Sequence, residues 1–180
     1  MIGSKVSKRY AKALLSLGEE EGYLQEYGRD LSEFSKFCQE NEEFGQVIAN
    51  RVFPVEDRKK ILNAVLERSS FSGAVNNFLN LLLDRNRIGA IERIADDYER
   101  LTDEMMNVAR AEVITLRPLK REAQERLEKA VAGLTSKRVK MEVRQDESVI
   151  GGLIVKIGDV VLDGSIRAQL EGLKESLKKG

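Results

Sequence analysis

Apolar residues recur at intervals of three and four positions from Ser4 to about Asn107, with polar residues between them. This spacing places the apolar side chains of each segment on one helical face. The first stripe ends at Gly18, and Pro54 suits the first turn of a later helix. Short polar links join the segments, which predicts a compact bundle of six amphipathic helices. Their apolar stripes span residues 6–17, 24–38, 44–48, 61–66, 78–83 and 91–105.

The hydrophobic pattern changes its period in the C-terminal part of the chain. Residues 110–116 and 138–144 alternate between apolar and polar side chains, which is typical of half-buried strands. Two short apolar runs follow at residues 153–157 and 160–162. The Gly158-Asp159 link between them tolerates a positive φ, so it predicts a tight hairpin.

Two helices are predicted among these strands. One begins at Pro118 and carries apolar positions through Leu134, and the other follows Asp163-Gly164-Ser165, which suits a helix N-terminus. This part is therefore predicted as a β-α-β-β-α unit with about four strands and two helices. The fold class is α+β with two domains, an N-terminal six-helix bundle over residues 1–106 and a small α+β domain over residues 107–180.

Composition narrows the function classes. With 30 basic and 30 acidic residues among 180, the net charge is zero, so no global field would recruit nucleic acid or anionic lipid. One cysteine, Cys38, excludes an internal disulfide framework and suits a reducing compartment. The apolar runs are far shorter than the roughly 20 residues that span a bilayer. We expect a cytoplasmic protein that reaches a membrane only through a partner.

Catalytic chemistry is not indicated. Histidine is absent, so Cys38 has no activating base, and its place on an apolar stripe suits a small core residue. The acidic runs at 19–21, 42–43 and 96–97 lie in or beside polar helix faces, where solvated charge is usual. The glycines after Ile150 lack the phosphate-loop pattern, and Gly151 and Gly152 suit a bend or a close approach before a strand. We expect no catalytic residue, no metal and no cofactor.

A basic cluster surrounds the first C-terminal helix and the strand after it. Every Phe and Tyr lies before residue 99, so aromatic side chains that would stack on RNA bases are missing from this region. A solvated surface is the ordinary explanation, and a docking face for an acidic partner is the alternative. The cluster comprises Arg117, Lys120, Arg121, Arg126, Lys129, Lys137, Arg138 and Lys140.

The first and fifth helices carry more apolar surface than one buried stripe requires. Ala11 and Leu15 flank the stripe of Tyr10, and leucines cover most of the circumference of residues 78–83. Such helices are usually central in their bundle. Alternatively, part of this surface forms an exposed groove for the amphipathic helix of a partner.

Three motifs in order along the chain carry a family resemblance. Arg9-Tyr10-Ala11 with Ala13-Leu14 reproduces an R-Y-A-x-A-L opening, and residues 77–87 reproduce an N-F-L-x-L-L-x-x-N-R pattern. The third is Ile150–Leu170, IGGLIVKIGDVVLDGSIRAQL. Together they resemble the δ-subunit family of bacterial F-type ATP synthase, known in mitochondria as the oligomycin-sensitivity-conferring protein. One departure is Thr115-Leu116, where the family usually has a small pair.

The resemblance implies a non-catalytic stator subunit that holds the α/β head still, so that rotor torque drives ATP synthesis. In this family the N-terminal bundle binds N-terminal helices of the α subunits between the first and fifth helices. The C-terminal domain contacts the b subunits of the peripheral stalk. Carried over by motif, the residues for the α subunits are Tyr10, Ala13, Leu14, Asn77 and Leu81. Ile150, Gly151, Gly152, Asp163, Gly164, Ser165 and Arg167 are signature positions for a stalk contact or for the fold.

The same resemblance implies one copy per complex, a monomer when isolated, and a peripheral position on the cytoplasmic face of the cell inner membrane. Two other functions stay open at this stage. A general two-domain adaptor would bind helical peptides of other proteins. An RNA-binding regulator would use the basic cluster, and its affinity would fall steeply with salt.

Overall fold

The computed structural model describes the backbone of residues 2–179, and the side chains of residues 5–171, 174 and 177. The chain divides into two compact units, Met1–Thr102 and Asp103–Gly180. Helices dominate the first unit, and the second contains a four-stranded sheet with helices. The expected mixed α+β class is confirmed.

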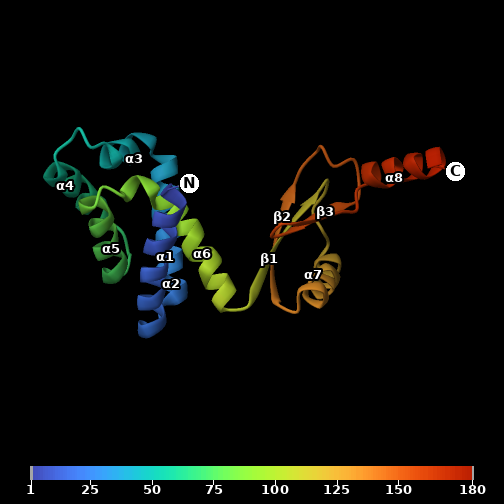
Figure 1. Cartoon of the computed structure of the whole chain (residues 1–180), viewed down its shortest axis with the longest axis horizontal. Coiled ribbons are helices and arrows are strands. Elements are labelled where there is room, and N and C mark those ends of the chain that lie inside the picture. Colours follow the sequence, from blue (N-terminus) through green and yellow to red (C-terminus); the bar gives the residue numbers. More distant parts are fainter. Residues whose placement is uncertain (1, 180) are drawn as a thin grey trace. The chain divides into compact units, whose positions relative to one another are not determined.

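The first unit is built from helices of unequal length (Figure 1). Short links separate them, and a single 3-10 turn, η1, leads directly into the last helix. The elements within the described residues are α1 (Ile2–Glu21), α2 (Leu24–Glu40), α3 (Glu42–Ala49), α4 (Val55–Leu66), α5 (Gly73–Asp84), η1 (Ile88–Ala90) and α6 (Ile91–Met105).

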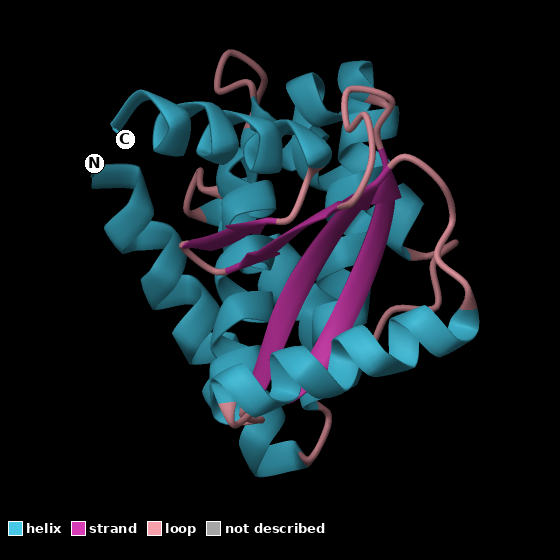
Figure 2. Cartoon of the chain, turned by 90° about the vertical axis from the view of Figure 1, so that its right-hand side faces the viewer, coloured by secondary structure: helices cyan, strands magenta, loops and turns pink. Residues whose placement is uncertain are grey.

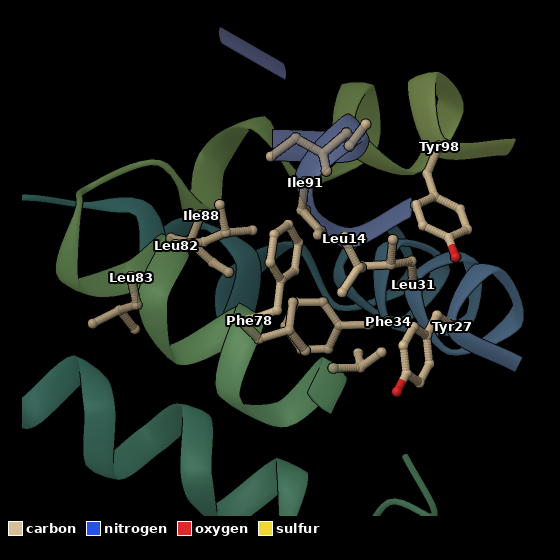
Figure 3. Packing of buried hydrophobic residues seen from close by; sticks show 14 of the residues in the cluster. Leu14, Tyr27, Leu31, Phe34, Phe78, Leu82, Leu83, Ile88, Ile91 and Tyr98 are labelled. Carbon is tan, nitrogen blue, oxygen red and sulfur yellow. The ribbon is translucent and has the colours of Figure 1, made fainter. Parts of the chain in front are cut away.

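The apolar stripes of these helices meet in one core (Figure 3). Leu14, Leu31 and Phe78 come from three different helices and are each at most 8% exposed. Phe34 packs edge to face against Phe44, with ring centroids 6.2 Å apart. Burying a side chain of this size contributes about 1.5–3 kcal/mol, so the core is the main stabilising term of the unit.

A buried guanidinium links three segments of the first unit. Arg58 on α4 is 2% exposed, and it donates to the carbonyl oxygen of Ile48 at 3.2 Å and to Asn86 Oδ1 at 2.8 Å. Asn86 stands in the left-handed region, with φ of 53°, in the turn after α5. Because a buried charge is costly without partners, these hydrogen bonds hold the end of α3, the start of α4 and this turn together.

The second unit contains β1 (Val108–Thr115), α7 (Arg121–Thr135), β2 (Arg138–Gln145), β3 (Leu153–Ile157), β4 (Val160–Asp163) and α8 (Ile166–Lys179). The strands form one sheet in the order β2-β1-β3-β4 (Figure 2). β1 and β2 are parallel, and the other pairs are antiparallel. The sheet has the expected four strands and is accompanied by the two expected helices, although the order β-α-β-β-α leaves out one arm of the predicted hairpin. The two arms of the predicted hairpin are separate strands, paired through Ile157 and Val160 across a turn where Gly158 has φ of 57°.

Alternation along β1 gives the sheet two different faces. Ala111 and Val113 are buried and belong to a small core with Val131 of α7 and Val155 of β3. The intervening Glu112 instead forms an ion pair with Lys156, 3.4 Å away. One face of the sheet is therefore apolar and covered by α7, while the other carries charges.

The signature segment folds back on itself between β3 and α8. The backbone N–H of Ile166 donates to the carbonyl oxygen of Gly151 at 3.1 Å, and Ser165 Oγ caps α8 by accepting from the N–H of Ala168 at 3.2 Å. Hydrogen bonds from the side chain and from the backbone N–H of Ser165 lower the pKa of the Asp163 carboxyl. Gly152 has φ of 79°, and a Cβ there would lie 2.3 Å from the carbonyl oxygen of Gly164.

We predict that Gly152→Ala destabilises the C-terminal unit, because the added methyl group meets backbone atoms as well as an unfavourable φ. Gly158→Ala is the matched control, since its φ is also positive but nothing lies within 4 Å of the added carbon. Thermal unfolding and hydrogen exchange of the β3 amides should show at least twice the stability loss for Gly152→Ala. Equal losses would contradict the close-approach explanation.

Candidate functional site

A groove of about 550 Å³ runs between α1 and α5. It contains all five residues predicted for the first unit, namely Tyr10, Ala13, Leu14, Asn77 and Leu81. The remaining lining residues are Leu17, Glu21, Ala74 and Phe78.

Small side chains make the groove, and large ones form its floor. Ala13 on α1 and Ala74 on α5 leave space between the helices, whereas Leu14 is 2% exposed and belongs to the core. The ring of Tyr10 meets that of Phe78 edge to face, with centroids 6.3 Å apart. The groove is therefore an apolar depression with a rigid base.

α5 serves both the core and the groove. Val75, Leu79 and Leu82 have no exposed surface, which satisfies the expectation of a central helix. Leu81 on the same helix is 44% exposed and lines the groove. The buried face of α5 therefore fits the interpretation as a central helix, and another face lines an apolar groove.

A buried carboxylate determines where α5 begins. Asp30 on α2 is 1% exposed and accepts a hydrogen bond from the backbone N–H of Ser72 at 2.8 Å. Ser72 in turn caps α5 by accepting from the N–H of Val75 at 3.3 Å. Further along α5, Asn80 donates to Asn63 of α4 at 3.0 Å. These polar contacts hold one wall of the groove in place.

Charged side chains lie at one end of the groove and beside the other end. Glu21 accepts a short hydrogen bond from the hydroxyl of Tyr27, which together with burial raises the pKa of Tyr27 to about 12. The phenol therefore stays protonated and keeps the carboxylate in position. Toward the other end, the Arg9 guanidinium lies 5.8 Å from the centre of the Tyr10 ring.

Sequence reasoning missed Glu21 as a groove residue, because it stands in an acidic run that was assigned to solvent. Its spacing carried a usable signal, since Tyr10, Leu14, Leu17 and Glu21 recur at intervals of four, three and four. Helical periodicity alone would have placed Glu21 on the groove face of α1.

Reactive chemistry has no support in this part of the molecule. Cys38 is half-buried against the core, and burial raises the pKa of its thiol to about 11, so little thiolate forms near neutral pH. No group of three or more His, Cys, Asp or Glu among the described residues is placed to hold a metal ion. The groove offers a binding surface rather than a catalytic one.

The signature residues of the second unit have structural tasks. Gly152 and Gly164 allow close backbone approach, Gly151 leaves room for the side chain of Ile166, and Asp163 and Ser165 order the start of α8. Ile150 is 63% exposed, and Arg167 and Asp163 are exposed as well.

The second unit also exposes apolar side chains that sequence reasoning did not select. The edge strand β4 and the start of α8 carry them. Single exposed leucines are ordinary, but a run of them on two consecutive elements marks an interaction surface. These exposed residues are Val160, Val161, Leu162, Ile166 and Leu170.

Within residues 2–179, no helix is both long enough and apolar enough to cross a membrane.

Comparisons with known proteins agree along nearly the whole chain. Residues 6–177 match the family model described as ATP synthase delta (OSCP) subunit. A protein named ATP synthase subunit delta from Desulfatibacillum aliphaticivorans is 41% identical over 99% of this chain and 98% of its own length. Another with that name, from Geobacter metallireducens, is 38% identical over 100% of both chains. A chain in the cryo-EM structure of the Toxoplasma gondii mitochondrial ATP synthase hexamer has the same fold. It has a TM-score of 0.69 and 19% identity over 95% of this chain and 96% of its own.

We predict that Asp30→Ala destabilises the first unit by about 1–3 kcal/mol, because it leaves the partly buried N–H of Ser72 without its acceptor. Asp30→Asn keeps an acceptor oxygen and should cost less. Urea unfolding followed by circular dichroism measures both, with the exposed Asp57→Ala as control. If Asp30→Ala unfolded at the same urea concentration as Asp57→Ala, the hydrogen bond would not be what secures α5.

Proposed function

Because this chain belongs to the ATP synthase delta (OSCP) family and is a non-catalytic peripheral-stalk subunit of the F-type ATP synthase, we propose that each unit binds a different part of the stator. The N-terminal domain, a six-helix bundle over residues 1–106 that includes the first unit, binds N-terminal helices of the α subunits in the α1/α5 groove. The C-terminal domain, over residues 107–180, binds the b subunits. This family membership favours the stator over a general adaptor or an RNA-binding regulator.

The observation that carries the first assignment is the groove itself. Five residues selected by motif lie on one apolar depression between the two helices that the family uses. From Tyr10 to Glu21 the groove follows α1 for 11 residues, which is about 16 Å, or three helical turns. An amphipathic helix with apolar residues at i, i+3, i+4 and i+7 matches such a surface in length and in character.

The second assignment rests on the apolar side chains of β4 and α8. An amphipathic helix can cover such side chains, and the long helical subunits of a stalk supply that kind of surface. Ile150 and Arg167 flank the region in sequence and are exposed. The five signature residues between and around them support the fold of this surface instead of touching the partner.

The mechanical task follows from this arrangement. Rotation of the central rotor would drag the catalytic head with it unless the head were tied to a static element. A subunit that grips both the head and the stalk transmits the opposing torque, so it needs binding free energy and no chemistry. Two modest contacts on one chain bind with high combined affinity, because the second contact forms at high effective concentration.

We place one copy of the chain in each complex, on the cytoplasmic face of the cell inner membrane, attached only through its partners. The isolated chain is a monomer. In that state the groove and the exposed apolar residues of β4 and α8 face water, which favours association with the complex.

The direct test is calorimetric titration of the full chain into catalytic heads stripped of their δ subunit, with the N-terminal segment of the α subunits intact or removed. We expect tight binding at one chain per head that disappears when the segment is removed. No binding to intact heads would contradict the assignment of the groove.

We predict that Leu81→Glu weakens binding to the head by more than about tenfold, because it places a charge on an apolar side chain that lines the groove. Leu81 is 44% exposed, so the change should leave the fold intact. Ile61→Glu is the matched control, since Ile61 is 40% exposed but lies on α4, away from the groove. Equal affinities of the two variants in the same titration would count against the groove.

We predict that Leu170→Glu leaves head binding unchanged and weakens binding to the soluble part of the b subunits. Leu170 is 61% exposed on α8. Leu134→Glu on α7, at a side chain 70% exposed, is the control of equal charge. Sedimentation with purified b fragments measures the effect, and a loss of binding for Leu134→Glu alone would move the contact to α7.

A further inference from the structure

The charges of α1 are separated along its length. Every charged side chain in the first half of the helix is basic, and every one in the last turn is acidic. The basic residues are Lys5, Lys8, Arg9 and Lys12, and the acidic residues are Glu19, Glu20 and Glu21.

This arrangement is unfavourable for the helix itself. A helix carries partial positive charge at its N-terminus and partial negative charge at its C-terminus, so acidic residues are favoured in the first turn and basic residues in the last. α1 has neither. Its side-chain charges add to the macrodipole instead of opposing it, which makes its two ends strongly different in potential.

Of the two helices that form the groove, only α1 contributes charged side chains at or beside its ends. Among the residues of α5 the only charged side chain is Asp84, and it is paired with Lys59 at 2.9 Å. Glu21 lines one end of the groove, and its carboxylate is held by the Tyr27 hydroxyl. Arg9 does not line the groove, but it lies one helical turn before the lining residue Ala13 and 5.8 Å from the centre of the Tyr10 ring, which places it beside the other end.

We propose that the groove accepts its partner helix in one direction only, antiparallel to α1, with a basic side chain of the partner on Glu21 and an acidic side chain on Arg9. The positive N-terminal end of the partner then lies beside the acidic end of α1. In this direction both the side-chain charges and the helix dipoles are complementary, whereas in the reverse direction both repel.

The distance between Glu21 and Arg9 determines how far apart the matching charged residues of the partner helix must lie. Glu21 follows Arg9 by 12 residues, which is about 18 Å along the axis. The partner helix therefore carries a basic residue roughly 12 positions before an acidic one, on the face that holds its apolar stripe. This inference rests on the proposed function and adds the direction and the charge pattern of the bound helix.

The direction is measured with a synthetic peptide of the N-terminal segment of the α subunit from the same organism. A nitroxide is attached to either end of the peptide, and paramagnetic broadening is read on amides of the isotope-labelled full chain. We expect the N-terminal label to broaden amides around Glu21 and the C-terminal label those around Arg9. The reverse pattern, or broadening of both ends by both labels, overturns the proposal.

The charge pairing is tested with Glu21→Lys, which should weaken binding of the unlabelled peptide about fivefold at low salt and less at high salt. Glu19→Lys makes the same change in net charge and in the same turn, but its position is two residues from Glu21 and off the groove face. It should change the affinity less than about twofold. Changing the basic residue of the peptide that faces Glu21 to Glu should restore binding to Glu21→Lys.

The thermal stability of Glu19→Lys should equal or exceed that of the wild type, because a lysine in the last turn suits the helix dipole. Affinity loss with unchanged folding identifies a role in recognition. If the wild-type chain and Glu21→Lys bind the peptide with equal affinity, the groove remains the binding site but the proposed charge pairing is wrong. If the wild-type chain does not bind the peptide, the proposed function fails as well.

Discussion

The hydrogen bond from the backbone N–H of Ser72 to the buried carboxylate of Asp30 is the contact on which the first unit most depends. It fixes the N-terminus of α5 against α2, and α5 contributes side chains to the core on one face and to the groove on another. A buried carboxylate is costly unless it is paired with donors, so this position tolerates few alternatives. With an apolar contact at the same place α5 could shift along α2, whereas this hydrogen bond fixes the position of α5 relative to α2.

Both units expose apolar side chains among the described residues, and two such places are the groove and the surface of β4 with the start of α8. A protein built only for stability would bury Leu81 and Leu170, but each is largely exposed. Both side chains belong to the surfaces that we propose as binding sites. The first unit can leave a groove open because its core is large, while the small core of the second unit leaves β4 and the start of α8 uncovered.

In our proposal, the charges of this chain determine the direction of the bound helix more than the strength of binding. The net charge is zero, so long-range attraction to a partner is weak, and the charges act where they are placed. In α1 that placement opposes the preference of the helix itself. A groove lined by apolar side chains distinguishes the two directions of a bound helix poorly, and in our proposal the separated charges of α1 supply the distinction.

Local order was readable from the residues alone. The three-to-four spacing of apolar positions predicted the helices, the alternation of Ala111 and Val113 predicted a strand with one buried face, and Gly158 predicted a hairpin. These features depend on interactions between near neighbours in the chain, which a single sequence contains. The five motif residues lie along one groove, and only their family resemblance brought Asn77 and Tyr10 together in advance.

Only the tertiary structure showed what depends on contacts between distant residues. Gly152 is required because the carbonyl of Gly164 passes close to it, and no local pattern encodes that approach. Asp30 was indistinguishable from a solvated acid until Ser72 was placed beside it. For the same reason, only the packed structure showed that Glu21 lines the groove and that Leu170 is exposed on α8. Sequence periodicity says which face of a helix a residue occupies, but whether that face meets the core, a groove or water is decided by how the helices pack.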